Sequence, residues 1–240
     1  MGVVKKLIGK IARDAGYDIT RKNNGYFDRR VAFFNQHGIT VVLDVGANVG
    51  QYASRIRSLG YKGRIESFEP EPESFAKLQQ HFSADHDWRG HQVAVGASRG
   101  EVLLQVSEKR SLSSVLSPNT NLAGSLPGAS VEKTEPVRME SIDSVWSSVV
   151  RPDDIVALKV DTQGFESEVL RGARESLADV SILEVELAFA EFYEGQRLLY
   201  EMIPEIRDLG FRLIDIDDSR RSSHEVHPMI DTDTLWVRDG

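Results

Sequence analysis

The sequence has 240 residues and a formal net charge of −8, with 29 Lys and Arg against 37 Asp and Glu. This acidic balance argues against non-specific nucleic-acid binding, which needs a basic surface to match the phosphates. Cysteine is absent, which excludes disulfides and thiolate metal sites and agrees with a reducing, cytoplasmic location. No run reaches the roughly 18 apolar residues of a transmembrane helix and no apolar leader precedes a cleavage site, so we expect neither a membrane span nor a signal peptide. The length suits one α/β domain and leaves the oligomeric state open.

The first 37 residues are expected to form a helical appendage to the main domain. Apolar residues recur at helical spacing through residues 3–15, with lysine and arginine mostly around the rest of the helix. Such a basic amphipathic helix either docks on the main domain, as most do, or makes a weak contact with a membrane surface or a lipid substrate. Phe27, Val31 and Phe34 indicate a second helix before Gly38.

A buried strand that runs into a glycine turn and then a helix is the central signal, at residues 41–52. The strand is an apolar, β-branched run interrupted only by Asp44, which fits a strand covered on both faces. Gly46 and Gly50 frame a tight turn in which backbone N–H groups can approach a ligand, and the next helix aims its free N–H groups at the same place. This arrangement predicts a nucleotide-type cofactor site, with an ordinary βα turn as the alternative.

The spacing within this turn selects among cofactors. A dinucleotide fingerprint needs Gly-x-Gly-x-x-Gly, but Asn48 and Gln51 stand at its second and third glycine positions. The Asn48 amide both donates and accepts hydrogen bonds, which suits a ribose or an amino-acid-like group better than a pyrophosphate. The next strand, residues 64–69, ends in Glu69 before Pro70. An acidic residue about 20 positions after the glycine turn can bind both ribose hydroxyls, and a solvated loop carboxylate is the alternative.

Weaker signals follow this strand. Residues 71–82 indicate a helix, and residues 92–95 and 102–106 indicate two short strands. Residues 107–135 are then rich in Ser, Asn, Gly and Pro, with few periodic apolar positions. Loops of this length are usually functional or disordered, so we expect either a lid over the site or a flexible insertion.

Strands and helices alternate through the rest of the chain, which predicts a mainly parallel, doubly wound sheet in one domain. The expected elements are a helix over 139–149, a strand over 155–161, a helix over 165–177, a strand over 180–187, a helix over 194–209 and a closing hairpin of strands 211–216 and 234–238. Asp161 ends one buried strand, and Glu184 and Glu186 lie in phase near the end of the next. The polar loop of the hairpin holds His224 and His227.

From about Gly38 to Val237, the chain resembles the FkbM family of S-adenosylmethionine-dependent methyltransferases. The resemblance rests on the segments Leu43–Tyr52, Ser67–Pro70, Val93–Gly96, Leu158–Glu166 and Asp233–Arg238. It implies a class I methyltransferase (Rossmann-like) fold over residues 38–240. In that fold a doubly wound, mainly parallel seven-stranded sheet ends with an antiparallel C-terminal strand.

The resemblance also implies which residues bind the cofactor, S-adenosylmethionine. The turn with Gly46 and Asn48 would surround its methionine end, Glu69 would hold the ribose, and the turn at 94–96 would border the adenine. The full set of expected cofactor-binding residues is Asp44, Gly46, Asn48, Gly50, Gln51, Tyr52, Glu69, Pro70, Ala94, Val95 and Asp161.

The expected acceptor is a hydroxyl of a small molecule or a glycolipid. Members of the resembled family methylate hydroxyl groups of sugars, glycolipids or macrolide-type products. N-methylating relatives in the wider class often carry an Asp/Asn-Pro-Pro-aromatic turn. Asp161-Thr162-Gln163-Gly164 stands in its place, which argues against nitrogen acceptors.

Transfer to a hydroxyl requires removal of its proton, and Asp161 is our candidate general base. Two alternatives are that Asp161 holds a divalent cation that acidifies the hydroxyl, or that it merely caps the next helix. Glu186 and His224 are the other candidate bases, although a histidine in a polar loop is usually just solvated. We predict no metal-ligand set, although the i, i+3 spacing of His224 and His227 suits a metal pair. Lys159 and Glu184 are expected to pair with nearby charges.

Two other functions compete with methyl transfer. A nicotinamide-dependent oxidoreductase is weakened by the missing middle glycine of the dinucleotide pattern, and binding of NAD(H) without S-adenosylmethionine binding would favour it. A non-catalytic binding module on the same fold predicts that Asp161→Ala and Glu69→Ala leave the biological activity intact.

Overall fold

The structure is a computed structural model that describes residues 25–119, 126–217 and 230–239. The predicted helix over 3–15 lies outside this part of the chain, as do the candidate base His224 and the neighbouring His227. The first half contains α2 (Gly25–Gln36), β1 (Val41–Val45), α3 (Gln51–Ser58), β2 (Arg64–Phe68), α4 (Pro72–His81), β3 (Trp88–His91), β4 (Ala94–Val95), β5 (Gly100–Ser107) and the 3₁₀ turn η1 (Arg110–Leu112). The second half contains β6 (Val131–Glu140), α6 (Ile142–Val149), β7 (Val156–Val160), α7 (Glu166–Arg171), η2 (Ser176–Asp179), β8 (Val180–Ala188), α8 (Leu199–Asp208), β9 (Phe211–Ile216) and β10 (Asp231–Arg238).

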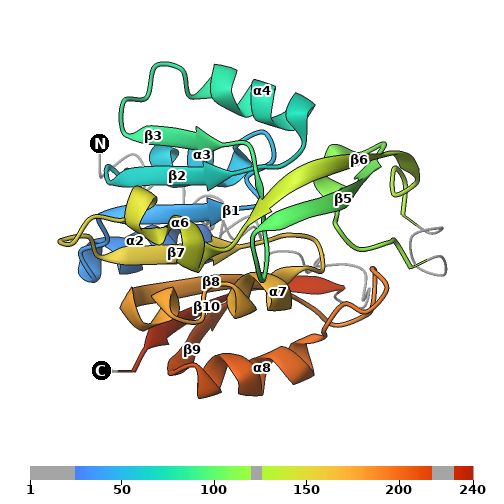
Figure 1. Cartoon of the computed structure of the whole chain (residues 1–240). Helices are drawn as coiled ribbons and strands as arrows, with labels where there is room; N and C mark the ends of the chain where they lie inside the picture. The colour runs from blue at the N-terminus through green and yellow to red at the C-terminus, as the bar shows by residue number, and fades with distance from the viewer. Residues whose placement is uncertain (1–24, 120–125, 218–229, 240) are drawn as a thin grey trace, which may run out of the picture.

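A seven-stranded sheet with the order β3-β2-β1-β7-β8-β10-β9 forms the centre of the molecule (Figure 1). Neighbouring strands pair in parallel through β3, β2, β1, β7 and β8, whereas β10 runs antiparallel to both β8 and β9. This confirms the predicted mainly parallel sheet with an antiparallel C-terminal strand. The chain winds outward from β1 in one direction and later from β7 in the other. The carboxyl ends of β1 and β7 therefore form the switch point at which such sheets bind ligands.

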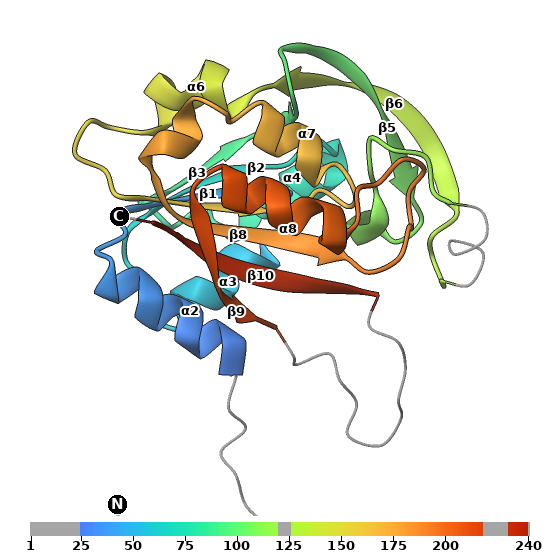
Figure 2. The ribbon, with the colours of Figure 1, turned by 90° about the horizontal axis from the view of Figure 1, so that it is seen from below.

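Helices cover both faces of this sheet, as Figure 2 shows for α6, α7 and α8 on one side and α2 and α3 on the other. Leu43 packs into the core cluster shared with α6, α7 and α8, whereas Val42 packs into the cluster shared with α2, α3 and α4. Every residue of β1 is consequently buried. Burial on both faces explains why its sequence is a continuous apolar run rather than an alternating one.

A small second sheet, ordered β4-β6-β5, lies beyond the carboxyl ends of β1 and β2 (Figure 1). Strands β5 and β6 pair antiparallel from Gly100 opposite Met139 to Ser107 opposite Val131. Leu104, Val106 and Met139 form a separate small core with Ala94 of β4. The hairpin thus adds a wall to the edge of the main sheet where ligands bind.

The structure corrects several expected boundaries. Strand β6 begins at Val131, so the predicted loop over 107–135 ends earlier than expected. Half of the residues of this strand are exposed and most are polar, which hides the apolar alternation of a strand. Strand β3 was not expected, and the strand predicted over 92–95 contracts to β4 in the second sheet. The helix predicted from 139 starts at Ile142, where the Ser141 hydroxyl caps it, and the helix predicted from 194 starts at Leu199.

Helix α2 docks on the α3 side of the sheet. The Arg30 side chain is fully buried and forms an ion pair with Glu184 of β8, and the exposed Arg29 guanidinium donates two hydrogen bonds to Asp215 of β9 at 2.5 and 3.0 Å. Tyr26 and Phe34 fill the core beneath the helix. Among the described helices, none combines the length and apolar character needed to cross a membrane.

Candidate active site

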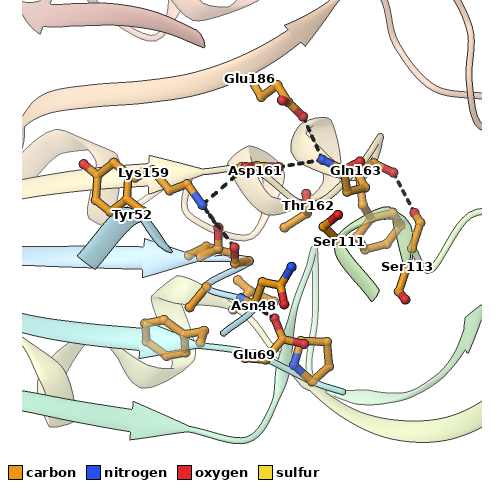
Figure 3. A pocket seen from close by; sticks show the side chains of 18 of the residues that line it. Asn48, Tyr52, Glu69, Ser111, Ser113, Lys159, Asp161, Thr162, Gln163 and Glu186 are labelled. Carbon is orange, nitrogen blue, oxygen red and sulfur yellow. Dashed lines mark hydrogen bonds and ion pairs between the residues drawn. The ribbon is translucent and has the colours of Figure 1, made fainter. Parts of the chain in front are cut away.

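A cavity of about 670 Å³ opens at the carboxyl ends of β1, β2, β7 and β8 (Figure 3). Its walls come from the turns after β1, β2 and β7, from α2, α3, β4, β5 and the segment after β5, and from the ends of β8 and β10. Most of the residues expected at the site do line it. These are Gly46, Asn48, Gln51, Tyr52, Glu69, Pro70, Ala94, Val95, Asp161 and Glu186.

The turn after β1 has the backbone that its sequence predicts. Gly46 and Gly50 have φ angles of 78° and 91°, and Asn48, between them, has a φ of 49°. A Cβ atom on Gly46 would lie 1.7 Å from the carbonyl oxygen of Asp161. Glycine therefore allows both the left-handed turn and the close packing of this turn against the end of β7. Gly50 ends the turn as the cap residue before α3 and is not part of the cavity wall.

Glu69 lies at the end of β2 and faces the cavity. Its carboxylate accepts a hydrogen bond from the Asn48 N–H at 2.7 Å and another from the Glu71 N–H at 2.8 Å. Burial raises the pKa of Glu69 to about 7, against the opposing effect of these two N–H groups. The glycine turn and the acidic residue after β2 are thus joined directly, and in Figure 3 Asn48 is drawn between Glu69 and Asp161.

A row of charged residues lies beneath the cavity, on the α2 and α3 side of the sheet. Asp44, Lys159 and Glu184 occupy the same register in β1, β7 and β8. The Lys159 Nζ lies 3.3 Å from the Asp44 Oδ1 and 3.6 Å from the Asp161 Oδ2, and Tyr52 donates a hydrogen bond to Glu184 at 3.0 Å. The expectation that Lys159 and Glu184 pair with nearby charges is confirmed.

Asp44 differs from its expected place at the cofactor. It is fully buried and is not part of the cavity wall, and Ser67 donates a hydrogen bond to its second oxygen at 3.3 Å. Burial raises the pKa of Asp44, although Lys159 opposes this effect. Burial alone would lower the pKa of Lys159, but Asp161 and Asp44 outweigh it and hold this pKa above its usual range. Asp44 therefore acts on the cavity through Lys159.

Gln163 joins the two candidate acidic bases. Its amide Nε2 donates to the Asp161 Oδ1 at 2.8 Å and to the Glu186 Oε2 at 2.9 Å (Figure 3). Gln163 has a φ of 56°, and Gly164 follows with a φ of 99°, so a strained turn aims this amide between the carboxylates. Asp161, Glu166 and Glu186 offer oxygens within 4.8 Å of one another.

The segment after β5 forms the wall opposite the β1 turn, with residues 109–115 facing the cavity. The Tyr193 hydroxyl donates to the Leu112 carbonyl at 2.9 Å, and the Ser114 hydroxyl donates to the Gln163 carbonyl at 2.7 Å. Arg110 donates to Glu132 at 2.6 Å. Hydrogen bonds to other elements therefore fix this part of the predicted loop at the cavity wall, and its role as a lid stays a prediction.

Some lining residues were not expected, among them four from α2, α3 and β10. Phe27 of α2, Arg55 of α3, and Asp231 and Asp233 of β10 all face the cavity. Arg55 follows Gln51 by four residues, so helical spacing alone could have found it. The positions of Phe27 and of the two aspartates depend on contacts between distant segments, for which the sequence carries no local signal.

The lining residues fit S-adenosylmethionine. The adenine would meet apolar side chains next to Glu69, among them Phe68, Val93 and Leu104. The Glu69 carboxylate is an acceptor for ribose hydroxyls at a strand end, and Asp161 and other charged groups line the rest of the cavity. When bound, this cofactor supplies an electrophilic methyl group on a sulfonium.

Comparison with known proteins finds two related methyltransferases and a weaker likeness among solved structures. The chain is 27% identical over 176 residues to the 2-O-methyltransferase NoeI of Sinorhizobium fredii, covering 68% of this chain and 71% of that protein. It is 25% identical over 219 residues to the 31-O-demethyl-FK506 methyltransferase FkbM of Streptomyces tacrolimicus, covering 80% and 82%. Among solved structures, the magnesium protoporphyrin IX methyltransferase ChlM of Synechocystis PCC 6803 aligns with a TM-score of 0.48 at 12% identity, over 99% of this chain and 96% of that one.

The assignment rests on the strand order, on the cavity at its switch point and on the family comparison. The family model described as the Methyltransferase FkbM domain matches residues 44–213, which include the β1 turn, Glu69, Asp161 and Glu186. The chain therefore belongs to the FkbM family of S-adenosylmethionine-dependent methyltransferases, with the class I fold.

Proposed function

We propose that the protein transfers a methyl group from S-adenosylmethionine to a hydroxyl group of a sugar, a glycolipid or a macrolide-type natural product. The observation that carries this proposal is the pair of carboxylates, Asp161 and Glu186, that Gln163 holds together at the cavity. A hydroxyl is a poor nucleophile until its proton is removed, so a proton acceptor beside the reacting oxygen is what this acceptor class requires.

The names of the relatives support oxygen as the acceptor atom. Both NoeI and FkbM are described as methyltransferases that act on oxygen positions. The turn after β7 supports it as well, because Gln163 and Gly164 adopt left-handed backbone conformations there. Proline, whose φ is fixed near −65°, does not fit position 163, where the Pro-Pro turn of nitrogen-methylating relatives has its second proline, so the two turns differ in shape.

The reaction is an in-line displacement at the methyl carbon. A C–O bond forms as the C–S bond breaks, the electron pair of the broken bond stays on sulfur, and the hydroxyl proton passes to a carboxylate. The products are a methyl ether and S-adenosylhomocysteine. The protein aligns the acceptor oxygen with the methyl carbon and sulfur, excludes water and accepts the proton.

Asp161 is the proposed general base. It follows β7 directly, and its backbone packs against Gly46 in the turn after β1, so it would lie beside the methionine end of a cofactor bound by that turn. Lys159 and Gln163 bind its two carboxylate oxygens and fix their direction. Glu186 contacts the same Gln163 amide and is the second candidate.

The decisive experiment is to incubate the protein with methyl-labelled S-adenosylmethionine and extracts of its source cells, fractionated into glycolipids and secondary metabolites. We expect label in a product whose new methyl group is bound to oxygen, as mass spectrometry and NMR of the purified product would show. A product labelled on nitrogen or carbon would contradict the proposal while leaving the family assignment intact.

A further inference from the structure

Arg55 stands out among the cations of the cavity wall. It lies one helical turn after Gln51 in α3 and lines the cavity with Phe27 and Tyr52. Within the described residues, no carboxylate forms an ion pair with its guanidinium, and its Cζ lies 5.3 Å from the centroid of the Phe27 ring. A guanidinium beside a ligand cavity with no acidic partner of its own is suited to an anionic group of the ligand.

The other lining cations are already engaged or lie elsewhere. Lys159 is held by Asp44 and Asp161. Arg110 pairs with Glu132 and with Glu73 of α4, and Lys109 adjoins it on the same wall. Glu73 belongs to α4, which begins at Pro72 soon after Glu69, so Arg110 lies on the side of the cavity where the ribose is expected.

Helix α2 holds Arg55 in place through Phe27. The Phe27 ring contacts two guanidinium groups, because the Arg30 Cζ lies 4.1 Å and the Arg55 Cζ 5.3 Å from the ring centroid. Arg30 is itself fixed by its buried ion pair with Glu184. The ring therefore has a rigid support and restricts where the Arg55 guanidinium can lie, which lowers the entropy lost when Arg55 binds a ligand.

The charges of the cofactor indicate what Arg55 binds. S-Adenosylmethionine carries a sulfonium, an α-ammonium and one anionic group, the α-carboxylate of its methionine end. Asp161, Glu186, Asp231 and Asp233 give the cavity wall acidic groups that suit the two cations. We propose that Arg55 binds the α-carboxylate of the cofactor, and that Phe27 is the positioning residue for Arg55.

This inference rests on the use of S-adenosylmethionine and is independent of the acceptor. It also gives α2 a place in cofactor binding, although α2 lies outside the family match at residues 44–213. A ligand carboxylate bound by a guanidinium makes a charge-assisted hydrogen bond, and removing either partner weakens binding about 10- to 100-fold.

The test measures binding by calorimetry with two ligands, S-adenosylhomocysteine and its decarboxylated analogue, which keeps the amine and lacks the carboxylate. We expect the wild type to bind S-adenosylhomocysteine about 10- to 100-fold more tightly than the analogue. Arg55→Gln should reduce this ratio to about twofold or less by weakening only the carboxylate-bearing ligand, because the interacting pair is then already broken. Arg55→Lys should fall between the two.

Phe27→Leu should weaken S-adenosylhomocysteine binding about two- to fivefold and leave the analogue unaffected, and Phe27→Tyr, which keeps the ring, should restore binding. Lys62→Gln is the matched control, because it removes one positive charge at an exposed position beyond α3 that does not line the cavity. Circular dichroism checks that each variant is folded.

An Arg55→Gln variant that binds S-adenosylhomocysteine like the wild type would overturn the inference. If the KM of that variant for the acceptor also rises, Arg55 binds an anionic group of the acceptor instead. A ratio between the two ligands that persists in Arg55→Gln would also overturn it. If the wild type binds neither ligand, the cofactor assignment falls together with the inference.

Discussion

Replacing Lys159 with methionine should destabilise the fold severely, because it leaves the Asp44 carboxylate buried without its cation. Asp44 is 0% exposed and Lys159 is 5% exposed, and the Lys159 Nζ also donates to the carbonyl oxygens of Val45 at 3.3 Å and Gly46 at 3.1 Å. Breaking a buried ion pair by removing one partner costs about 3–5 kcal/mol. We expect a loss of this size from the free energy of unfolding.

A double mutant separates the cost of the lone charge from the loss of packing. In Asp44→Asn/Lys159→Met both charges are absent, and replacing a whole buried pair by neutral groups is often close to neutral. The double variant should therefore be more stable than Lys159→Met by about 2 kcal/mol or more. Urea unfolding followed by circular dichroism gives the required free energies. Lys133→Met is the control, because Lys133 is exposed enough that its pairs with Glu71, Glu73 and Glu135 should contribute less than about 1 kcal/mol.

The loss in Lys159→Met should also depend on pH. Burial raises the pKa of Asp44, and removal of Lys159 leaves burial without its main opposition. The folded variant then binds a proton at pH values where the unfolded chain has released it, so its stability falls as the pH rises above the unfolded pKa of Asp44. The gap between the single and the double variant should be wider at pH 8 than at pH 5. Losses below about 1 kcal/mol in Lys159→Met, or losses that simply add in the double variant, would refute the reasoning.

Three further outcomes test the site. Asp161→Asn should retain S-adenosylhomocysteine binding and slow single-turnover methyl transfer about 10²- to 10⁴-fold, and an unchanged rate would exclude it as the base. Affinity for S-adenosylhomocysteine should rise between pH 6 and pH 8, because Glu69, with a pKa of about 7, accepts ribose hydroxyls best when ionised; Glu69→Gln should bind weakly with a flat profile, and a flat wild-type profile would contradict this role. Methyl transfer should survive exhaustive chelation, because the three carboxylates that could bind a cation already accept hydrogen bonds: Glu166 from the Thr162 and Gly164 N–H groups, and Asp161 and Glu186 from Gln163. A loss of activity that Mg²⁺ restores would favour a divalent cation at the site.

The sequence predicts the centre of the sheet and the carboxylates at its strand ends because these depend on local patterns. β1 and β7 are continuous apolar runs, and the position of Glu69 follows from its spacing to the glycine turn. β3, with the sequence Trp-Arg-Gly-His, shows no apolar alternation, and pairing with β2 is what makes it a strand. Tertiary contact overrides local preference in such edge strands.

The charged groups around the site were harder to assign because their partners are distant in the sequence. Arg30 and Glu184 form an ion pair from α2 to β8, and neither element carries a local signal of the other. Asp44 shows the same difficulty. The family resemblance suggested a place for Asp44 at the cofactor, but in a strand buried on both faces the side of the sheet decides what a side chain contacts. Asp44 shares the Val42 side, under α2 and α3.

The buried row of charges explains how the cofactor turn and the proposed base keep their relative position. Lys159 contacts both, since its Nζ donates to the Gly46 carbonyl and lies 3.6 Å from the Asp161 carboxylate. Gly46 also packs directly against the Asp161 backbone, so the turn after β1 cannot shift without moving the end of β7. In-line methyl transfer loses rate steeply when the acceptor, methyl and sulfur atoms are misplaced by about 1 Å. The buried charges cost free energy, but they fix the relative position of the two strand ends that hold the proposed cofactor turn and the proposed base.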